Sequence, residues 1–172
     1  MLIPSQAGNF VNLTEVDKAY IAGFFDGEGC LGYYNATLIN GKRPAYFHAS
    51  VSICNTDPRV IHWLSEVTGM GRSNITRFAD KKRRVAYQWQ IGRKADVVQF
   101  LTAIRVYLKV KGDQVDVLLA HLEAETMYVK KHGSVTPTIV ESRQQIADKL
   151  KIMKRMSIPE GVETRHVESF IH

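Results

Sequence analysis

The order of apolar and polar residues predicts helices and strands along most of the chain. The clearest strand is "FHASVSIC", residues 47–54, in which apolar residues recur at every second position. A period of two places them on one face of a sheet. The inward positions are Phe47, Ala49, Val51 and Ile53, and the outward ones are Tyr46, His48, Ser50 and Ser52. We expect one face to pack on a core and the other, which is polar without acids, to stay at the surface.

A first helix is predicted ahead of this strand. Thr14 is a suitable N-cap, and Asp17 occupies the capping-box position three residues later. The helix should run to about Asp26 and carry several small residues. These are Ala19, Ala22 and Gly23. Glycine inside a helix costs roughly 1 kcal/mol relative to alanine, so Gly23 indicates that another backbone packs closely there.

The remaining signals complete an α+β pattern. The pair Asn40-Gly41 predicts a hairpin turn. A helix capped at Thr56 or Asp57 and ended by Gly69 follows the return strand. Other expected elements are strands at about 30–38, 71–79 and 84–92 and helices near 94–107, 112–130 and 137–154. The second inward row is Val85, Tyr87, Trp89 and Ile91. The order αββαββα with C-terminal helices predicts one domain over residues 1–172 with a four-stranded antiparallel sheet.

Positive charge is concentrated in the middle of the chain. Residues 42–111 hold 14 Lys and Arg against 4 Asp and Glu, a net charge of +10, whereas the remaining residues have a net charge of −4. Such a distribution is typical of a surface that binds a polyanion, although a solvated basic face has the same composition. Charge alone leaves both interpretations open.

The cysteines and the apolar runs indicate the type of environment. Cys30 and Cys54 lie in strand-like segments without a CxxC or Cys/His cluster, so we expect buried free thiols in a reducing compartment. No run of about 18 apolar residues is present, and the N-terminus lacks the pattern of a secretory signal. These features predict an intracellular protein, in the cytoplasm or an organelle matrix, without a membrane span.

A short motif joins the first helix to the first strand. In "IAGFFDGEG", residues 21–29, two carboxylates and two glycines stand where an apolar helix ends. Together with "SICNTDPRV" (52–60) and "YLKVKGDQ" (107–114), this segment resembles the LAGLIDADG homing endonucleases in order and spacing. The resemblance covers about residues 14–120 and implies a saddle-shaped αββαββα fold. The family core would span about 14–130, with a helical extension over about 135–172.

The resemblance also implies an active site. Glu28 matches the metal-binding catalytic acid of the family, the carbonyl of Gly27 would be a further ligand, and the metal would be Mg²⁺ or Mn²⁺. Asp26 would have a structural role at the helix end. The other implied catalytic residues are Lys111, Asn55, Arg59 and Gln114. Without the resemblance, the lysine would be an ordinary solvated residue, Asn55 a turn residue and Glu28 a surface acid.

The motif occurs once, which in the family is typical of homodimers. The implied dimer contact is the small-residue face of the first helix, Ala19, Ala22 and Gly23. The implied activity is metal-dependent hydrolysis of double-stranded DNA at a pseudo-palindromic site of roughly 20 bp, leaving 3′ overhangs. Coding by a mobile intron or intein-like element is implied as well. The alternatives are a non-cleaving DNA-binding regulator and an RNA-splicing maturase with intron RNA as partner.

In the family, the outer face of the sheet binds the major groove of DNA. Side chains of this chain that suit base edges or phosphates lie on the predicted outward positions and in the loop between the last two strands. They are Tyr34, Lys42, Arg43, Tyr46, His48, Ser50, Ser52, Arg72, Asn74, Thr76, Lys81, Lys82, Arg83, Arg84, Gln88 and Gln90.

Overall fold

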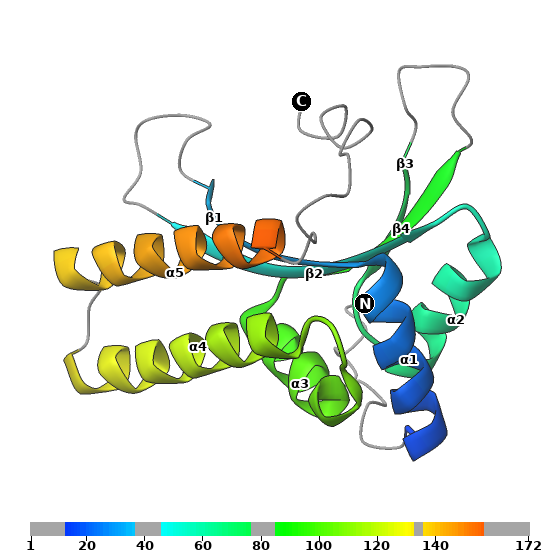
Figure 1. Ribbon diagram of the computed structural model, residues 1–172, viewed down its shortest axis with the longest axis horizontal. Helices are drawn as coiled ribbons and strands as arrows, with labels where there is room; N and C mark the ends of the chain where they lie inside the picture. The colour runs from blue at the N-terminus through cyan, green and yellow to red at the C-terminus, as the bar shows by residue number, and fades with distance from the viewer. Residues whose placement is uncertain (1–12, 37–45, 77–84, 133–135, 157–172) are drawn as a thin grey trace, which may run out of the picture.

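A computed structural model describes residues 13–36, 46–76, 85–132 and 136–156 of the chain (Figure 1). The helices are α1 (Glu15–Glu28), α2 (Pro58–Thr68), α3 (Lys94–Ile104), the short 3₁₀ helix η3 (Arg105–Tyr107), α4 (Gly112–His132) and α5 (Pro137–Met156). The strands are β1 (Gly29–Asn35), β2 (Phe47–Asn55), β3 (Arg72–Thr76) and β4 (Ala86–Ile91). They form one antiparallel sheet in the order β1-β2-β4-β3, which confirms the predicted α+β class.

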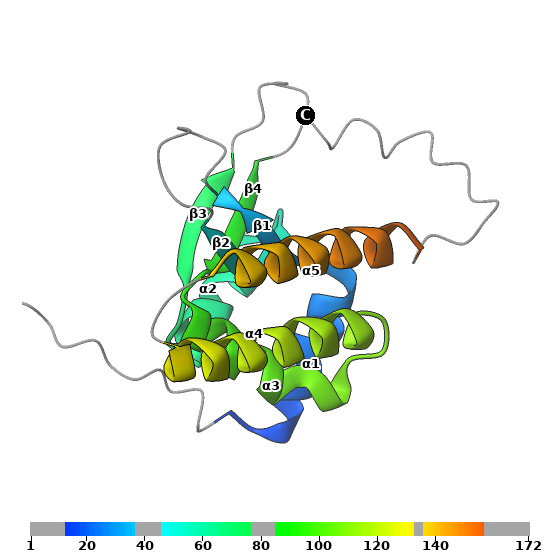
Figure 2. The same ribbon diagram turned by 90° about the vertical axis from the view of Figure 1, so that its left-hand side faces the viewer.

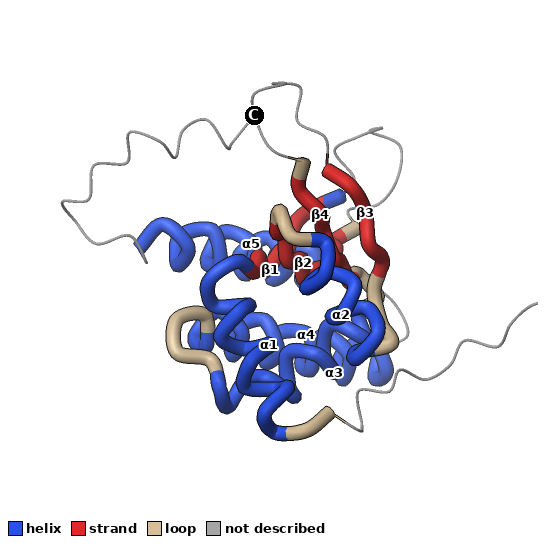
Figure 3. Tube along the Cα trace, turned by 90° about the vertical axis from the view of Figure 1, so that its right-hand side faces the viewer, coloured by secondary structure: helices blue, strands red, loops and turns tan. Residues whose placement is uncertain are grey.

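The helices are distributed unevenly about the sheet. Helices α1 to α4 lie on one side of it, and α5 lies beside β1 and above α4 (Figures 1 and 2). Figure 3 shows α1 and α2 next to each other beneath the strands, and the rings of Tyr20 and Trp63 join them edge to face at 5.3 Å. One face of the sheet therefore packs on α1 to α4. We call the opposite face, which none of these four helices covers, the outer face.

The core lies between the sheet and these helices. Phe25, Trp89 and Phe100 are fully buried, with the ring of Phe100 5.2 Å from that of Trp89 and 6.0 Å from that of Phe25. The inward row of β2 is buried as predicted. In β4, Trp89 and Ile91 are buried, but Val85 is 47% exposed and Tyr87 only partly covered. The predicted row was wrong at Val85 because β4 begins after it, at Ala86.

Local capping signals set the helix ends. Thr14 caps α1, and Asp17 completes the predicted capping box. Asp57, rather than Thr56, caps α2, because its carboxylate accepts a hydrogen bond from the backbone of Arg59. Gly69 ends α2 with a φ of 59°, a left-handed conformation that favours glycine. The predicted hairpin turn at residues 40–42 lies outside the described residues.

A polar cluster holds α4 and α5 against β1. The hydroxyl of Tyr33 lies 2.8 Å from Nε2 of the buried His121. Burial raises the pKa of Tyr33, so its hydroxyl stays protonated at neutral pH and pairs with the imidazole as a neutral group. Glu125 of α4 forms an ion pair with Arg143 of α5, and both side chains are 11% exposed. A second cation, Lys94, lies 3.7 Å from Glu125.

The cluster predicts loss of stability in mild acid. Burial lowers the pKa of His121 below its usual value of about 6.5, while Glu125 opposes this shift. Below about pH 6.5 the unfolded chain therefore binds more protons at this residue than the folded chain, and the free energy of unfolding falls. Urea unfolding from pH 7.5 to 5 should show a steeper decline for the wild type than for His121→Gln. Equal slopes would contradict the assignment.

Candidate functional site

The end of α1 is tied to the segment that precedes α4. The carboxylate of Asp26 accepts hydrogen bonds from the backbone N–H groups of Lys109 (2.7 Å), Val110 (3.1 Å) and Lys111 (2.9 Å). In return, Nζ of Lys111 donates to the backbone carbonyl of Asp26. We call this arrangement the Asp26 clamp. It joins two segments more than 80 residues apart and fixes where Lys111 lies.

Lys111 is half-buried over the end of α1. Its ammonium lies 5.8 Å from the centroid of the Phe25 ring. Burial lowers the pKa of Lys111, and electrostatic interactions, chiefly with Asp26 and also with Cys30 and Glu28, oppose that shift. Glu28 itself is exposed at the last position of α1. The clamp thus brings a cation to the end of the helix whose last residue is an exposed carboxylate.

Packing at the junction of α1 and β1 explains why one position of the motif is glycine. A Cβ added to Gly29 would lie 2.0 Å from Cδ2 of Phe25 and 2.5 Å from its carbonyl oxygen. At Gly27, by contrast, an added Cβ would meet nothing within 4 Å in this chain. Gly29 is therefore needed by the fold of the chain itself, whereas Gly27 faces open space.

The outer face of the sheet presents polar residues in rows across the strands. Strand pairing places Ser52 opposite Gln90 and Gln90 opposite Arg72. A neighbouring row contains Cys54, Gln88 and Asn74. Such rows of amide, hydroxyl and guanidinium groups are able to form hydrogen bonds with base edges.

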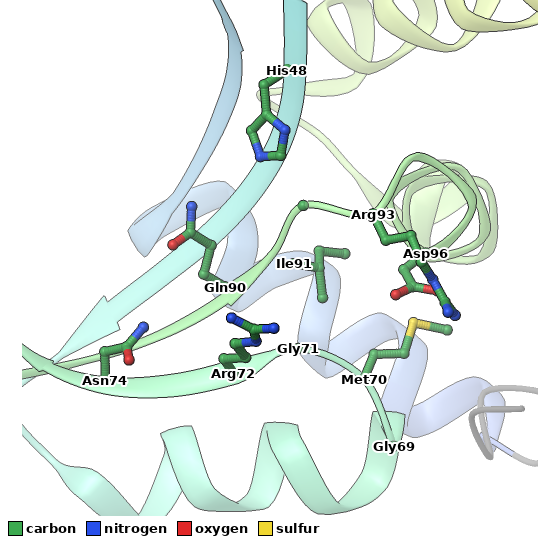
Figure 4. Close-up of a pocket in the computed structure, with 11 residues that line it drawn as sticks. His48, Gly69, Met70, Gly71, Arg72, Asn74, Gln90, Ile91, Arg93 and Asp96 are labelled. Atoms are coloured by element: carbon green, nitrogen blue, oxygen red, sulfur yellow. The ribbon is translucent and has the colours of Figure 1, made fainter. Parts of the chain in front are cut away.

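A pocket lies on the β3 side of this face, and β3 is the edge strand opposite β1. His48 from β2, Gln90 from β4, and Arg72 and Asn74 from β3 line it (Figure 4). Its remaining lining comes from residues 69–71, Ile91, Gly92, Arg93 and Asp96. Gly92 makes room for His48, since a Cβ there would lie 2.6 Å from Nε2 of that ring. The pocket is thus a polar, partly cationic hollow within the outer face.

Comparison with solved structures identifies the architecture. The chain is similar to the homing endonuclease I-CvuI in complex with the I-CreI target, with a TM-score of 0.64 and 16% identity over 81% of this chain and 82% of that one. The archaeal intron-encoded homing endonuclease I-Vdi141I complexed with DNA gives a TM-score of 0.59 and 18% identity over 86% and 87%. The LAGLIDADG homing endonuclease I-SmaMI bound to cleaved DNA gives a TM-score of 0.59 and 16% identity over 76% of this chain and 42% of that one.

The chain has the LAGLIDADG homing endonuclease fold. The resemblance of the three motifs is thus confirmed at the level of architecture. No family model matches the sequence, and no curated protein is similar to it.

In this fold, the other predicted catalytic residues are placed in different surroundings. Oδ1 of Asn55 accepts a hydrogen bond from the backbone of Asp57 at 2.8 Å and so closes the turn before α2. Arg59 binds both carboxylate oxygens of Asp57, which lowers the pKa of that acid to about 2. Gln114 is buried, and no described residue forms a hydrogen bond with its Oε1. Glu28 and Gly27 belong to the end of α1, and Lys111 packs against it. The catalytic or metal-binding roles of all six residues stay predictions.

The exposed face of α1 differs from the predicted one. Ala22 is fully buried between Ile21 and Phe25, so its side chain packs in the core of this chain and is unable to contact a second helix. Ala19 and Gly23 are exposed, as predicted for a contact face. Two large apolar side chains were missed, Val16 at 78% and Tyr20 at 56% exposure. The sequence contains a signal for this face, because residues 16, 20, 23 and 27 are three or four positions apart and therefore lie on one side of a helix.

The predicted DNA-binding residues are only partly described. Ser50 is 7% exposed, so its prediction as a surface residue was wrong. Gly32 of the neighbouring strand approaches it closely, since a Cβ there would lie 2.4 Å from Oγ of Ser50. The exposed or half-exposed ones are Tyr34, Tyr46, His48, Ser52, Arg72, Asn74, Gln88 and Gln90. Thr76 is the last residue of β3. Outside the described residues lie Lys42, Arg43, Lys81, Lys82, Arg83 and Arg84.

Both cysteines are free and belong to the outer face near Glu28. Cys30 is exposed, so the prediction of two buried thiols was wrong for this residue, which points away from the core side of β1. Burial raises the pKa of the half-buried Cys54, and Cys30 and Glu28 add to the shift. Within the described residues, no group of three or more His, Cys, Asp or Glu is placed to hold a metal ion. None of the described helices has the length and apolarity to cross a bilayer.

Removal of the Asp26 clamp should destabilise the fold. We expect Asp26→Ala to lower the free energy of unfolding by about 1.5–3 kcal/mol, the usual effect of losing a hydrogen bond to a charged group. Asp26→Asn keeps one acceptor oxygen and should lose less. As a control, Asp148→Ala at an exposed position of α5 should change stability by less than about 0.5 kcal/mol. Urea unfolding checks both; an unchanged Asp26→Ala protein would disprove the role of the clamp.

Proposed function

We propose that this chain is a site-specific endonuclease that cleaves double-stranded DNA with a divalent metal ion, as a homodimer. The observation that carries the proposal is the Asp26 clamp, which holds Lys111 against the end of α1, the helix whose last residue is the exposed Glu28. The fold supports it, because the similar structures include homing endonucleases with bound DNA. Membership of the LAGLIDADG family is part of the same proposal.

Glu28 and Gly27 would hold the metal. Their donor atoms are a carboxylate and a backbone carbonyl, hard oxygens that suit Mg²⁺ or Mn²⁺. The site lies at the C-terminal end of α1, where the last carbonyls lack partners within the helix. When bound, the metal would supply a polarised phosphate, an activated water and a stabilised leaving oxygen. One similar structure was determined in the presence of Mg and another in the presence of Ca, which is consistent with a divalent ion.

The second chain would pack along the exposed face of α1. Val16 and Tyr20 offer apolar area, and Gly23 and Gly27 leave space for a backbone to approach. A two-fold axis there brings both Glu28 carboxylates together. Two carboxylates about 6 Å apart would repel by about 3 kcal/mol at an effective dielectric constant of 20, a cost that a bridging cation offsets.

Lys111 would stabilise charge on the phosphate. Its bond to the carbonyl of Asp26 orients the ammonium, so that little reorganisation is needed when negative charge develops. Asn55 and Arg59 would complete a looser polar shell around the scissile bond. Gln114 is buried, so it would contribute through its side-chain Oε1, which has no hydrogen-bond partner among the described residues.

The outer face of the sheet would bind the major groove. Arg72 suits guanine, and the amides of Asn74, Gln88 and Gln90 suit adenine. The rows seen across β2, β4 and β3 give each strand several such groups at regular spacing. One subunit would cover a half-site of about 10 bp, and two subunits a pseudo-palindrome of about 20 bp with cleavage that leaves 3′ overhangs.

Selection of cleaved sites from a randomised DNA library in Mg²⁺ tests the activity. The wild type should yield a defined site, and Glu28→Gln should bind that site but leave it intact, because the metal ligand is lost. Glu66→Gln, an exposed acid of α2, is the matched control and should cleave normally.

Cleavage retained by Glu28→Gln would rule out the assigned metal ligand. A wild type that binds DNA and never cuts it would instead favour the non-cleaving regulator, and preference for intron RNA would favour the maturase.

The exposed thiol of Cys30 offers a second test. Bound DNA should cover Cys30, because it lies on the outer face beside Glu28, whereas Cys54 should react slowly with or without DNA. A Cys54→Ser variant reports Cys30 alone. We expect its reaction with a thiol reagent to slow several-fold at saturating DNA, and an unchanged rate would place the DNA elsewhere.

A further inference from the structure

The last turn of α5 carries a lysine to the proposed active site. Nζ of Lys154 lies 3.7 Å from Sγ of Cys30, the second residue of β1. Cys30 directly follows the Glu28-Gly29 end of the motif, and the charge of Lys154 also acts on Lys111. Lys154, which is 126 positions after Glu28 in the sequence, thus approaches the strand that begins directly after the motif helix. The motif resemblance does not reach this far along the sequence.

The position of Lys154 is fixed by the packing of α5. Leu150, one turn earlier, is 2% exposed, and Ile139 near the start of the helix is 8% exposed. The buried pair of Arg143 and Glu125 joins α5 to α4. Figure 2 shows α5 running across β1 in the direction of the end of α1. Its last turn is therefore docked on the sheet edge.

The surroundings of Lys154 favour an anion. Among the described residues, no carboxylate lies within salt-bridge distance of its ammonium. Its neighbour Cys30 offers only a weak acceptor, and Lys111 is a second cation close by. An ammonium group that forms no ion pair with a described carboxylate, with a second cation nearby and a polar sheet face beside it, is suited to a phosphate, which accepts several hydrogen bonds.

We propose that Lys154 binds a backbone phosphate of the DNA next to the cleavage centre, so that α5 forms part of the DNA-binding surface. This inference rests on the proposed function, because it takes DNA as the ligand. A cation in the last turn of a helix also interacts favourably with the helix dipole, and this purely structural role is the competing explanation.

The salt dependence of DNA binding separates the two explanations. Each phosphate contact contributes about −0.9 to the slope of log affinity against log salt concentration. The measurement uses the full chain and a mixed-sequence duplex of about three helical turns, without divalent metal. Lys154→Gln removes the charge. Lys149→Gln is the matched control, because it is exposed on the same helix and points about 140° away from Lys154. Lys154→Arg keeps the charge.

We expect Lys154→Gln to make the slope shallower by about 0.9 per bound subunit and to weaken binding. Lys149→Gln should match the wild type, and Lys154→Arg should restore most of the slope. A wild-type slope for Lys154→Gln, a failed rescue by arginine, or a wild type without DNA affinity would each overturn the inference. If the wild type binds DNA and does not cut it, the proposed nuclease fails, while the slopes still decide on Lys154.

Discussion

The geometry of the site depends on the carboxylate of Asp26. A charged acceptor that binds three consecutive backbone N–H groups holds the segment 109–111 in one conformation against the end of α1. The bond from Nζ of Lys111 to the backbone carbonyl of Asp26 joins the same two segments. Asp26 thus serves the fold, whereas Glu28, two residues later, is exposed and takes no part in the clamp.

The architecture separates stability from function by face. One side of the sheet packs its β-branched and aromatic residues on α1 to α4, while the other presents amides, hydroxyls and arginine. The end of α1 lies where these two faces meet, so some of its last residues pack in the core and others are exposed. Gly29 packs on Phe25 inside the chain, whereas Gly27 borders open space that a second subunit would fill.

The sequence predicted those features of the fold that depend on residues close together in the chain. The alternation in β2, the capping box at Thr14 and the glycine end of α2 are all determined by neighbouring residues, and each was found. The resemblance also implied that the segment around Lys111 belongs with the end of the first helix, and the Asp26 clamp joins the two segments. What failed depends on distant contacts: Ala22 turns inward, Ser50 is covered by its neighbours, and Cys30 is exposed. Lys154 had no signal at all, since its position follows from how α5 packs on β1.

The central claim is that two copies of this chain share one duplex, with their Glu28 residues meeting at the axis. Native mass spectrometry of the Glu28→Gln protein, mixed with a duplex that carries the selected site, measures this directly. The account predicts two chains per duplex, with loss of the complex when Gly23, on the exposed face of α1, is replaced by a bulky residue. A stable complex of one chain with one duplex would contradict it.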